Sequence, residues 1–393
     1  MLSPITRRNL CLSYGYAACA FFGITTLWVI FLQQQGLSLV EIGLCESVFH
    51  LTSFLSEVPS GILADRFGYR SVLVGSRLMA ISHAIIMLTA HSLTWFIVAF
   101  ILQAWAYNLQ SGTIAAAQYD SLVTDQATQH YPRVTTTLNT TIELADTIGV
   151  VLAGWFLPNH LITTYWLYLI VAAIAIVTAS WLHVSHTPSA TSSAEQPTLH
   201  QILIAAGHLL IAQPRLRTLM VFDALFSALG TTYYYYFQTV MTAHHFSGAL
   251  ITTVLISGMI LNILAIQITP WLQRHQTQRQ LLVKLCLGLV IALLSTFGHA
   301  IGLLVIIYLV INSLMAMIEP LFSNYYNQLI SNGQRATLLS VASMAFSLAM
   351  VGSFPLIGWL IQMVGFTVTF GSCGLLTLMT LLGIYRYEFH TVN

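Results

Sequence analysis

The chain has 393 residues, of which 57% are hydrophobic and only 6% are charged, and its formal net charge is +1. In a soluble globular protein roughly a quarter of all residues are charged. The composition of this chain therefore excludes an ordinary water-soluble fold and makes the lipid bilayer its main solvent. The near-zero net charge argues against a nucleic-acid partner.

Apolar stretches recur along nearly the whole sequence. A spanning helix needs about 20 mostly apolar residues, and we predict twelve such spans. The first is longer than a signal-peptide core and lacks a clear cleavage site, so we interpret it as a retained helix. The first six spans are Leu10–Leu32, Ile42–Ala64, Ser71–Ala90, Leu93–Tyr119, Thr136–Leu157 and Tyr165–Val184. The last six are Leu216–Met241, Gly248–Leu272, Leu281–Ala300, Leu303–Ile330, Leu338–Val364 and Phe366–Tyr385.

The spans fall into two sets of six. Residues 1–184 and 214–393 are expected to form two pseudo-symmetric six-helix bundles of an all-α membrane protein. Residues 185–213 are rich in Ser, Thr, Pro and His and form the expected cytoplasmic linker, in which Leu199–Ala212 is a candidate amphipathic helix. A weak internal repeat supports the division, since Gly154-Trp155-Phe156-Leu157 is echoed by Gly358-Trp359-Leu360-Ile361.

The cationic residues give the orientation. Loops on the cytoplasmic side of a membrane carry an excess of Lys and Arg, which predicts a plasma-membrane protein with both termini in the cytoplasm. Arg77 and Lys284 lie within two turns of the same side and are expected to snorkel to it. With twelve spans, the remaining cations all fall on one face: Arg7, Arg8, Arg66, Arg70, Arg133, Arg215, Arg217, Arg274, Arg279, Arg335 and Arg386.

The loop after the second span reads Gly61-Ile-Leu-Ala-Asp65-Arg66-Phe-Gly68-Tyr-Arg70. It resembles the cytoplasmic signature of the major facilitator superfamily, Gly-x-Leu-Ala-Asp-Arg-x-Gly-Arg-Lys. The resemblance implies that Asp65, Arg66 and Arg70 form a charge–dipole latch when the cytoplasmic side is closed, with the start of the eleventh span near Leu338 as partner. A plain cytoplasmic turn with solvated charges is the alternative.

Three further stretches bear on the resemblance to that family. Residues 42–53 resemble the second span of a bacterial drug-efflux-like branch, which implies export. The antiporter signature of the fifth span is poorly matched, because its Gly-Pro pair is missing, and this weighs against export by proton exchange. The second-half counterpart of the loop motif, residues 270–279, lacks the glycines and the aspartate, so a single strong latch is expected.

Acidic residues lie inside the predicted spans, where an ionisable group is costly and suggests function. A carboxyl group in a low-dielectric interior holds its proton more readily than in water. Glu46 and His50 lie about 40° apart on one helix face, and with Asp146 they are the proton-coupling candidates. No arginine or lysine is expected deep enough to neutralise the acids, and a structural role for each acid stays open. The six acids are Glu46, Glu57, Glu143, Asp146, Asp223 and Glu319.

Polar residues at helical spacing should converge on a central aqueous cavity. Asp223 and Glu319 are the candidates for contact with a cationic substrate, and the aromatic run Tyr233 to Phe237 would offer cation–π surface or a packed gate. On the fourth span, Gln118 is expected to share the face of Gln103. The cavity candidates are Gln103, Tyr107, Gln110, Asp223, Tyr234, Gln238, Asn312 and Glu319.

These features predict a secondary transporter that works by alternating access. The leading hypothesis is proton-coupled efflux of amphipathic or cationic compounds, and the alternative is a proton symporter that imports a polar nutrient such as a sugar or an amino acid. A non-transporting membrane sensor is the alternative from another class. Its partners would be a small-molecule substrate, protons and the lipid bilayer, and the protein is expected to be monomeric.

The sequence offers no signature of an enzyme, a cofactor or a metal site. Lys284 is the one lysine and follows Val283, so a P-loop is absent and active transport would draw on an ion gradient or a separate ATPase. The five cysteines are scattered without metal-ligand spacing.

Overall fold

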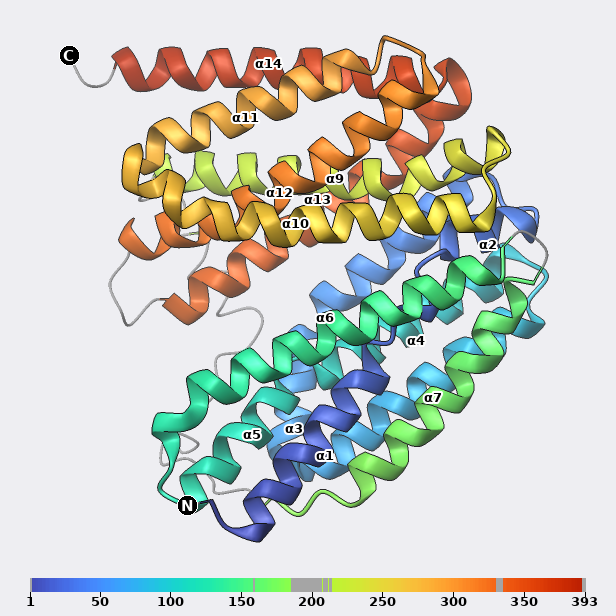
Figure 1. Cartoon of the computed structure of the whole chain (residues 1–393), viewed down its shortest axis with the longest axis vertical. Helices are drawn as coiled ribbons and strands as arrows, with labels where there is room; N and C mark the ends of the chain where they lie inside the picture. The colour runs from blue at the N-terminus through green and yellow to red at the C-terminus, as the bar shows by residue number, and fades with distance from the viewer. Residues whose placement is uncertain are drawn as a thin grey trace. The chain divides into compact units, whose positions relative to one another are not determined.

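The computed structural model describes residues 2–157, 160–184, 207, 211, 214–329 and 335–390, with side chains for all except 215, 323–329, 335–340 and 382–390. This part of the chain is helical and contains no strand (Figure 1), as the predicted all-α class requires. The expected linker at 185–213 and its amphipathic helix Leu199–Ala212 lie outside the described residues, apart from 207 and 211.

The chain forms two compact units, Met1–Gly36 with Leu44–Ala205, and Leu37–Gly43 with Ala206–Asn393. The helix α3 begins in the second unit and continues into the first. The helices up to residue 184 are α1 Pro4–Ala20, η1 Gly23–Thr25, α2 Trp28–Gln34, α3 Leu39–Thr89, α4 Leu93–Gln110, α5 Thr113–Thr124, η2 Thr128–His130, α6 Tyr131–Trp155 and α7 Ile162–Ser180. Those after residue 213 are α9 Pro214–Ala243, α10 Gly248–His275, α11 Gln278–Ser295, α12 Ile301–Leu329, α13 Arg335–Val364 and α14 Phe366–His390.

Each of the twelve predicted spans falls on these helices. By length and hydropathy, six of the described helices could cross a membrane, or seven if the bent pair Pro4–Thr25 and Trp28–Gln34 is one span. α3 counts once here, although its 51 residues form two helices that meet at a kink, and each part is about 20 residues or longer, enough to cross the hydrocarbon core. Gly68 interrupts it with φ 76° and ψ 158°, between the predicted spans Ile42–Ala64 and Ser71–Ala90.

The prediction of continuous first and fourth spans is wrong. α1 ends at Ala20, and α2 starts at Trp28 after the short helix η1, with a bend of 44° between the two parts. The fourth span consists of α4 and α5, separated by Ser111 and Gly112. Gly112 has φ 75°, a left-handed conformation that glycine adopts without the steric cost of a side chain.

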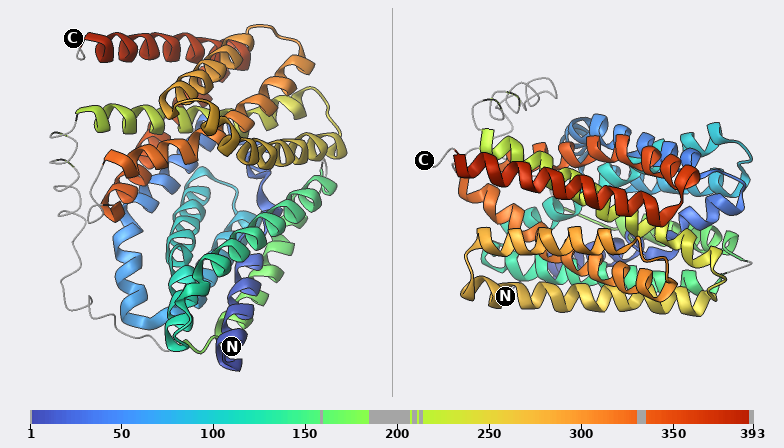
Figure 2. Two further views of the ribbon diagram at one scale, coloured as in Figure 1. Left: turned by 60° about the vertical axis from the view of Figure 1, so that its left-hand side comes forward. Right: turned by 90° about the horizontal axis from the view of Figure 1, so that it is seen from above.

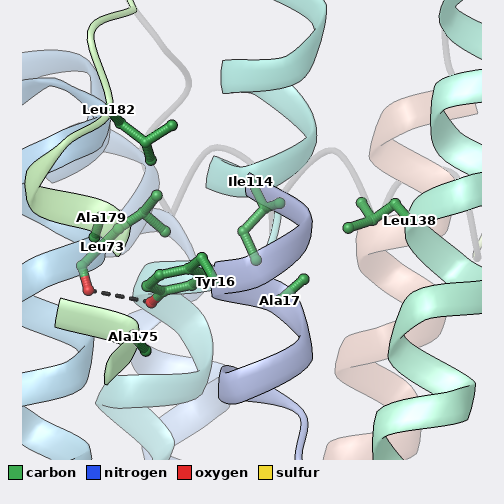
Figure 3. Packing of buried hydrophobic residues seen from close by; sticks show 8 residues of the cluster. All are labelled: Tyr16, Ala17, Leu73, Ile114, Leu138, Ala175, Ala179 and Leu182. Atoms are coloured by element: carbon green, nitrogen blue, oxygen red, sulfur yellow. Dashed lines mark hydrogen bonds between the residues drawn. The ribbon is translucent and has the colours of Figure 1, made fainter. Parts of the chain in front are cut away.

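Small residues bring the helices of the first unit together. α1 contacts α5, α6 and α7 (Figure 1). Ala17 of α1 belongs to one buried cluster with Ala175 and Ala179 of α7, and Tyr16 donates a 3.1 Å hydrogen bond to the carbonyl of Leu73 in this cluster (Figure 3). Close approach through alanine and glycine is how helices associate inside a bilayer, where apolar burial gives little driving force.

The short helix η1 contacts α6 most closely at two glycines. A Cβ added at Gly149 of α6 would overlap the backbone nitrogens of Gly23 and Ile24, and a Cβ at Gly23 would overlap Asp146. The interruption of the first span therefore lies directly against the helix that carries Asp146, and only glycine fits at both positions.

In the second unit, α9 contacts α12, α13 and α14, and α11 contacts both α12 and α14 (Figure 2). Aromatic rings fill the space between α9 and its neighbours. Tyr233, Tyr236 and Phe237 of α9 are fully buried. Phe237 stacks on Tyr308 of α12 with ring centroids 5.2 Å apart, and Tyr236 packs on Phe354 of α13 at 4.8 Å.

Candidate functional site

Glu46 and His50 form a buried pair on α3. His50 Nε2 lies 3.4 Å from Glu46 Oε1, and both residues are less than one-tenth exposed. The spacing of four residues puts both side chains on one face of the helix. The ring of Phe49 lies edge-on to the His50 imidazole, with centroids 5.3 Å apart. The two proton-coupling candidates on α3 therefore lie on one face, as predicted, and are in contact.

Asp146, the third coupling candidate, lies on a different helix. It comes from α6, is partly buried, and sits beside the backbone of Gly23 in the interruption of the first span. Glu143, one turn earlier on α6, is exposed. Asp146 thus belongs to the α6–η1 contact, whereas Glu46 and His50 belong to α3.

The polar residues of the fourth span do not form one stripe, because the helix breaks at Gly112. Gln103 and Tyr107 lie on α4, where Gln103 Oε1 is buried and has no hydrogen-bond partner among the described residues, and Tyr107 is 46% exposed. Gln118 lies on α5 instead and donates a 2.7 Å hydrogen bond to Ser13 Oγ of α1. The expected alignment of Gln118 with Gln103 is wrong.

The expectation that Arg77 snorkels to the cytoplasmic side is wrong. Arg77 is only 2% exposed and lies inside the first unit. Its guanidinium donates to Gln110 Oε1 and to Ser76 Oγ, the latter at 3.0 Å. Gln110, a predicted cavity residue, is 3% exposed and is engaged by Arg77. The distance of Arg77 from the loop suggested snorkelling, but its rotation about α3 turns it toward other helices.

Asn108 is a polar residue that the sequence analysis missed. Its amide donates to the Ser53 carbonyl at 2.6 Å and to Ser56 Oγ at 2.8 Å, and its oxygen accepts from Ser53 Oγ at 2.8 Å. These contacts join α4 to α3 on the stretch that carries Glu46 and His50. A signal was available, because Ser53 and Ser56 lie one turn apart on the second span and Asn108 is a polar residue within the fourth.

In the second unit the predicted cavity residues are less clustered. Asp223 of α9 is partly buried and lies 3.4 Å from Ser227 Oγ on the same helix, while Glu319 of α12 is exposed. Asn312 donates a 2.8 Å hydrogen bond to the Tyr308 carbonyl of its own helix. These two hydrogen bonds each lie within one helix.

Tyr234 and Gln238 lie one turn apart on α9. Tyr234 is partly buried and stacks on Tyr308, with ring centroids 5.8 Å apart. Gln238 is fully buried, and neither atom of its amide group has a hydrogen-bond partner among the described residues. Three of the five residues of the aromatic run are fully buried, so the run is largely packed, and its role as a gate stays a prediction.

The beginning of α3 is held tightly within the second unit. Tyr236 Oη lies 2.9 Å from the Phe354 carbonyl oxygen and 3.2 Å from that of Leu39, and its single proton can be donated to either. A Cβ at Gly43 would collide with the backbone of Pro355, and one at Gly358 would collide with the Leu39 carbonyl. Sequence reasoning missed this contact.

The loop motif lies at the break in α3. Gly68 adopts φ 76°, which explains the glycine at this position. Asp65, Arg66 and Arg70 are exposed, as is Gly61. The expected latch partner near Leu338 has no described side chain, so the latch stays a prediction.

The chain is similar to a known protein family and to several solved transporter structures. The family model described as Major Facilitator Superfamily matches residues 10–352. No curated protein matches the chain. Similar solved structures include the nucleoside transporter NupG, with a TM-score of 0.76, 15% identity and coverage of 98% of this chain and 100% of that one. A D-xylose-proton symporter matches with a TM-score of 0.70, 14% identity and 95% coverage of both chains. A POT family transporter in complex with 5-aminolevulinic acid matches with a TM-score of 0.69, 14% identity, and coverage of 96% and 95%.

Proposed function

The chain belongs to the major facilitator superfamily, and we propose that it is a proton-coupled secondary transporter that carries a small polar solute by alternating access. The observation that supports the coupling step is the buried contact of 3.4 Å between His50 and Glu46. A carboxylate and an imidazole in contact can share one proton and accept a second, because imidazole titrates near neutral pH in water. The pair can therefore gain and lose a proton during each transport cycle.

Asp146 is the second coupling candidate in this proposal. It lies where the first span is interrupted, beside Gly23, and no ion pair to a basic residue is found for it in the part of the chain that the structure describes. A protonatable group at a bend can link its charge state to the angle of that bend. We propose that Glu46 with His50 binds the coupling proton and that Asp146 responds to it.

For the cargo, a polar solute that forms hydrogen bonds is favoured by Gln238 and Gln103. Both carry buried amide atoms without partners among the described residues. A site built to hydrogen-bond a hydroxyl or amide group contains such groups before the solute arrives. The nucleoside transporter and the D-xylose-proton symporter are named for solutes of this kind, which supports import of a polar nutrient.

Efflux of amphipathic or cationic compounds is the second candidate. It is favoured by Asp223 and Glu319, which supply carboxylates in the second unit, and by the partly buried Tyr234, which offers a ring face to a cation. We further propose that the protein lies in the plasma membrane as a monomer with cytoplasmic termini, and that Asp65, Arg66 and Arg70 form its cytoplasmic latch.

Reconstituted protein tests the proposal. Liposomes that contain a pH-sensitive dye are given an inward proton gradient and supplied in turn with uridine, D-xylose, a dipeptide or ethidium. We expect cargo-dependent proton entry with one of the three neutral polar probes. Glu46→Gln should abolish it, whereas Arg133→Gln, which changes an exposed charge on α6, should not. Proton-driven uptake that survives Glu46→Gln would remove Glu46 from the mechanism. Movement of ethidium alone would establish the efflux candidate instead.

A further inference from the structure

Arg77 is a buried cation that the proposed transport cycle does not use. Its guanidinium donates to Gln110 Oε1, to Ser76 Oγ at 3.0 Å and to the Ala20 carbonyl at 3.5 Å, and it lies 5.6 Å from the centroid of the Tyr16 ring. Its Nε has no partner within the described residues. Arginine does not lose its charge in proteins, so a full positive charge is enclosed in the first unit.

No carboxylate forms an ion pair with Arg77 in the described part of the chain. Burial of an unpaired cation is expensive, so other groups must balance it. Two of its acceptors lie at helix ends: Ala20 is the last residue of α1, and Gln110 is the last residue of α4. The carbonyl end of a helix carries a partial negative charge of about half an electron. The Ala20 carbonyl supplies this partial charge at the end of α1, and the amide oxygen of Gln110 supplies a polar side-chain acceptor at the end of α4.

The same two helix ends are the interruptions of the first and fourth spans. The last carbonyls of a helix have no partner within it and are costly to bury unless another donor reaches them. Arg77 reaches the Ala20 carbonyl, and Ser76 Oγ donates at 2.6 Å to the carbonyl of Ala106 in α4. Two successive residues of α3, Ser76 and Arg77, therefore donate hydrogen bonds to α1 and α4 near both interruptions.

We propose that Arg77 is a positioning residue that joins the ends of α1 and α4 and so sets the geometry of both interrupted spans. The role needs arginine, because its planar fork reaches acceptors in several directions, whereas a lysine ammonium is a point donor on a flexible stem. The contact geometry stands by itself, and only its consequence for transport rests on the proposed function.

The native Cys19 offers a readout that needs no cargo. It lies one residue before the end of α1, is partly buried, and packs against the cluster that contains Tyr16. In a parent protein that keeps Cys19 and has serine at the other four cysteines, we measure alkylation by a small maleimide after purification. Loss of buried hydrogen bonds at the break should raise the rate by about fivefold or more in Arg77→Lys. Arg133→Gln, which changes an exposed arginine on α6, should react at the parent rate.

A second substitution that restores the contact distinguishes a positioning role of Arg77 from a general loss of stability. Gln110→Glu places a carboxylate opposite residue 77, so it should restore slow alkylation to Arg77→Lys but not to Arg77→Met, in which the new acid has no cation. If the Arg77 variants do not accumulate, Gln110→Met tests the same contact from the other side and should also alkylate faster. Parent-rate alkylation in both Arg77→Lys and Gln110→Met would overturn the proposal, as would equal rescue of the Lys and Met variants.

Discussion

The hydroxyl of Tyr69 donates a 2.7 Å hydrogen bond to Asp120 Oδ2, and this bond ties the loop motif in α3 to α5. Tyr69 follows Gly68 directly, so the bond is made at the point where α3 breaks. Burial and the neighbouring Asp120 both raise the pKa of Tyr69. Tyr69 therefore stays a protonated donor, and its contribution to stability is complete below the ordinary tyrosine pKa of about 10 and declines as the pH rises above it.

Removal of this hydroxyl should loosen the turn at Gly68. Tyr69→Phe keeps the ring and removes the hydrogen bond to Asp120, and we expect a loss of about 1 kcal/mol of stability. Thermal unfolding of the purified protein measures it. Tyr119→Phe is the matched control, because Tyr119 is exposed and its ring lies edge-on to Tyr131, a contact that phenylalanine keeps. Equal midpoints for the two variants would show that the bond contributes nothing.

Gly149→Ala should damage the contact between α6 and η1. The added methyl group would overlap backbone atoms of Gly23 and Ile24, which cannot move aside as a side chain can, so we expect a cost of about 1–3 kcal/mol or failure to accumulate. Gly75→Ala is the control, because a Cβ there meets nothing within 4 Å. Membrane yield and thermal midpoint report the difference. A tolerated Gly149→Ala would mean that the two helices can separate at this point.

Asn108 was not predicted as a site residue, but we expect it to contribute to the stability of the first unit. Asn108→Ala removes the acceptor of the Ser53 hydroxyl and the amide donor to Ser56 Oγ, whose own proton is donated to the Thr52 carbonyl, and we expect a loss of about 1–3 kcal/mol. A double-mutant cycle with Ser56→Ala measures the coupling between the two side chains by thermal unfolding. Strict additivity would show that this bond between α4 and α3 carries no interaction energy.

The start of the chain should loosen in acid. The Ser3 backbone N–H donates a 2.6 Å hydrogen bond to Asp125 Oδ2, and this bond is the main cause that lowers the pKa of Asp125. A lowered pKa stabilises the fold above the ordinary carboxyl pKa of about 3.9, and the effect is lost as the pH falls through the folded value. Hydrogen exchange of residues 3–6, corrected for its intrinsic pH dependence, should stay slow from pH 7 to 5 and rise below about pH 4. Asp125→Ala should exchange fast throughout, and protection equal to that of the parent would contradict the assignment.

The length of each apolar stretch correctly predicted where uninterrupted helices begin. Gly248 begins α10 and Phe366 begins α14, as expected from hydropathy and the preceding loops. The breaks after Ala20 and at Gly112 could not be predicted, because a window of about 20 residues averages over a short interruption. They also depend on contacts such as Gly23 with Gly149, which join distant parts of the sequence.

In the candidate site, too, contacts within one helix could be predicted from the sequence, whereas contacts between helices could not. The contact between Glu46 and His50 follows from helical spacing alone, so the sequence predicted it. The burial of Arg77 depends on how α3 is rotated and on acceptors from α1 and α4, which no spacing within the third span reveals. A polar Gln110 in an apolar span was a signal, but it was interpreted as a cavity residue rather than as a partner.

One substitution at Gln238 should have opposite effects on stability and on cargo binding. Its amide group is fully buried without a hydrogen-bond partner among the described residues, a state that costs about 1–3 kcal/mol. Leucine has a similar size and no polar atoms, so Gln238→Leu should unfold at a higher temperature than the parent. If the amide binds cargo, the same variant should lose about tenfold or more in cargo affinity.

Gln278→Leu is the matched control for this last prediction. Gln278 Nε2 donates a 2.9 Å hydrogen bond to the Leu321 carbonyl, so leucine there should lower the thermal midpoint. Cargo-dependent thermal shifts of the two variants give stability and binding in one experiment. A Gln238→Leu variant that loses stability as Gln278→Leu does would show that the amide is already satisfied in the cargo-free protein. A stabilised variant that binds cargo as tightly as the parent would remove Gln238 from the binding site, because an unsatisfied amide that contacts the solute cannot be removed without loss of affinity.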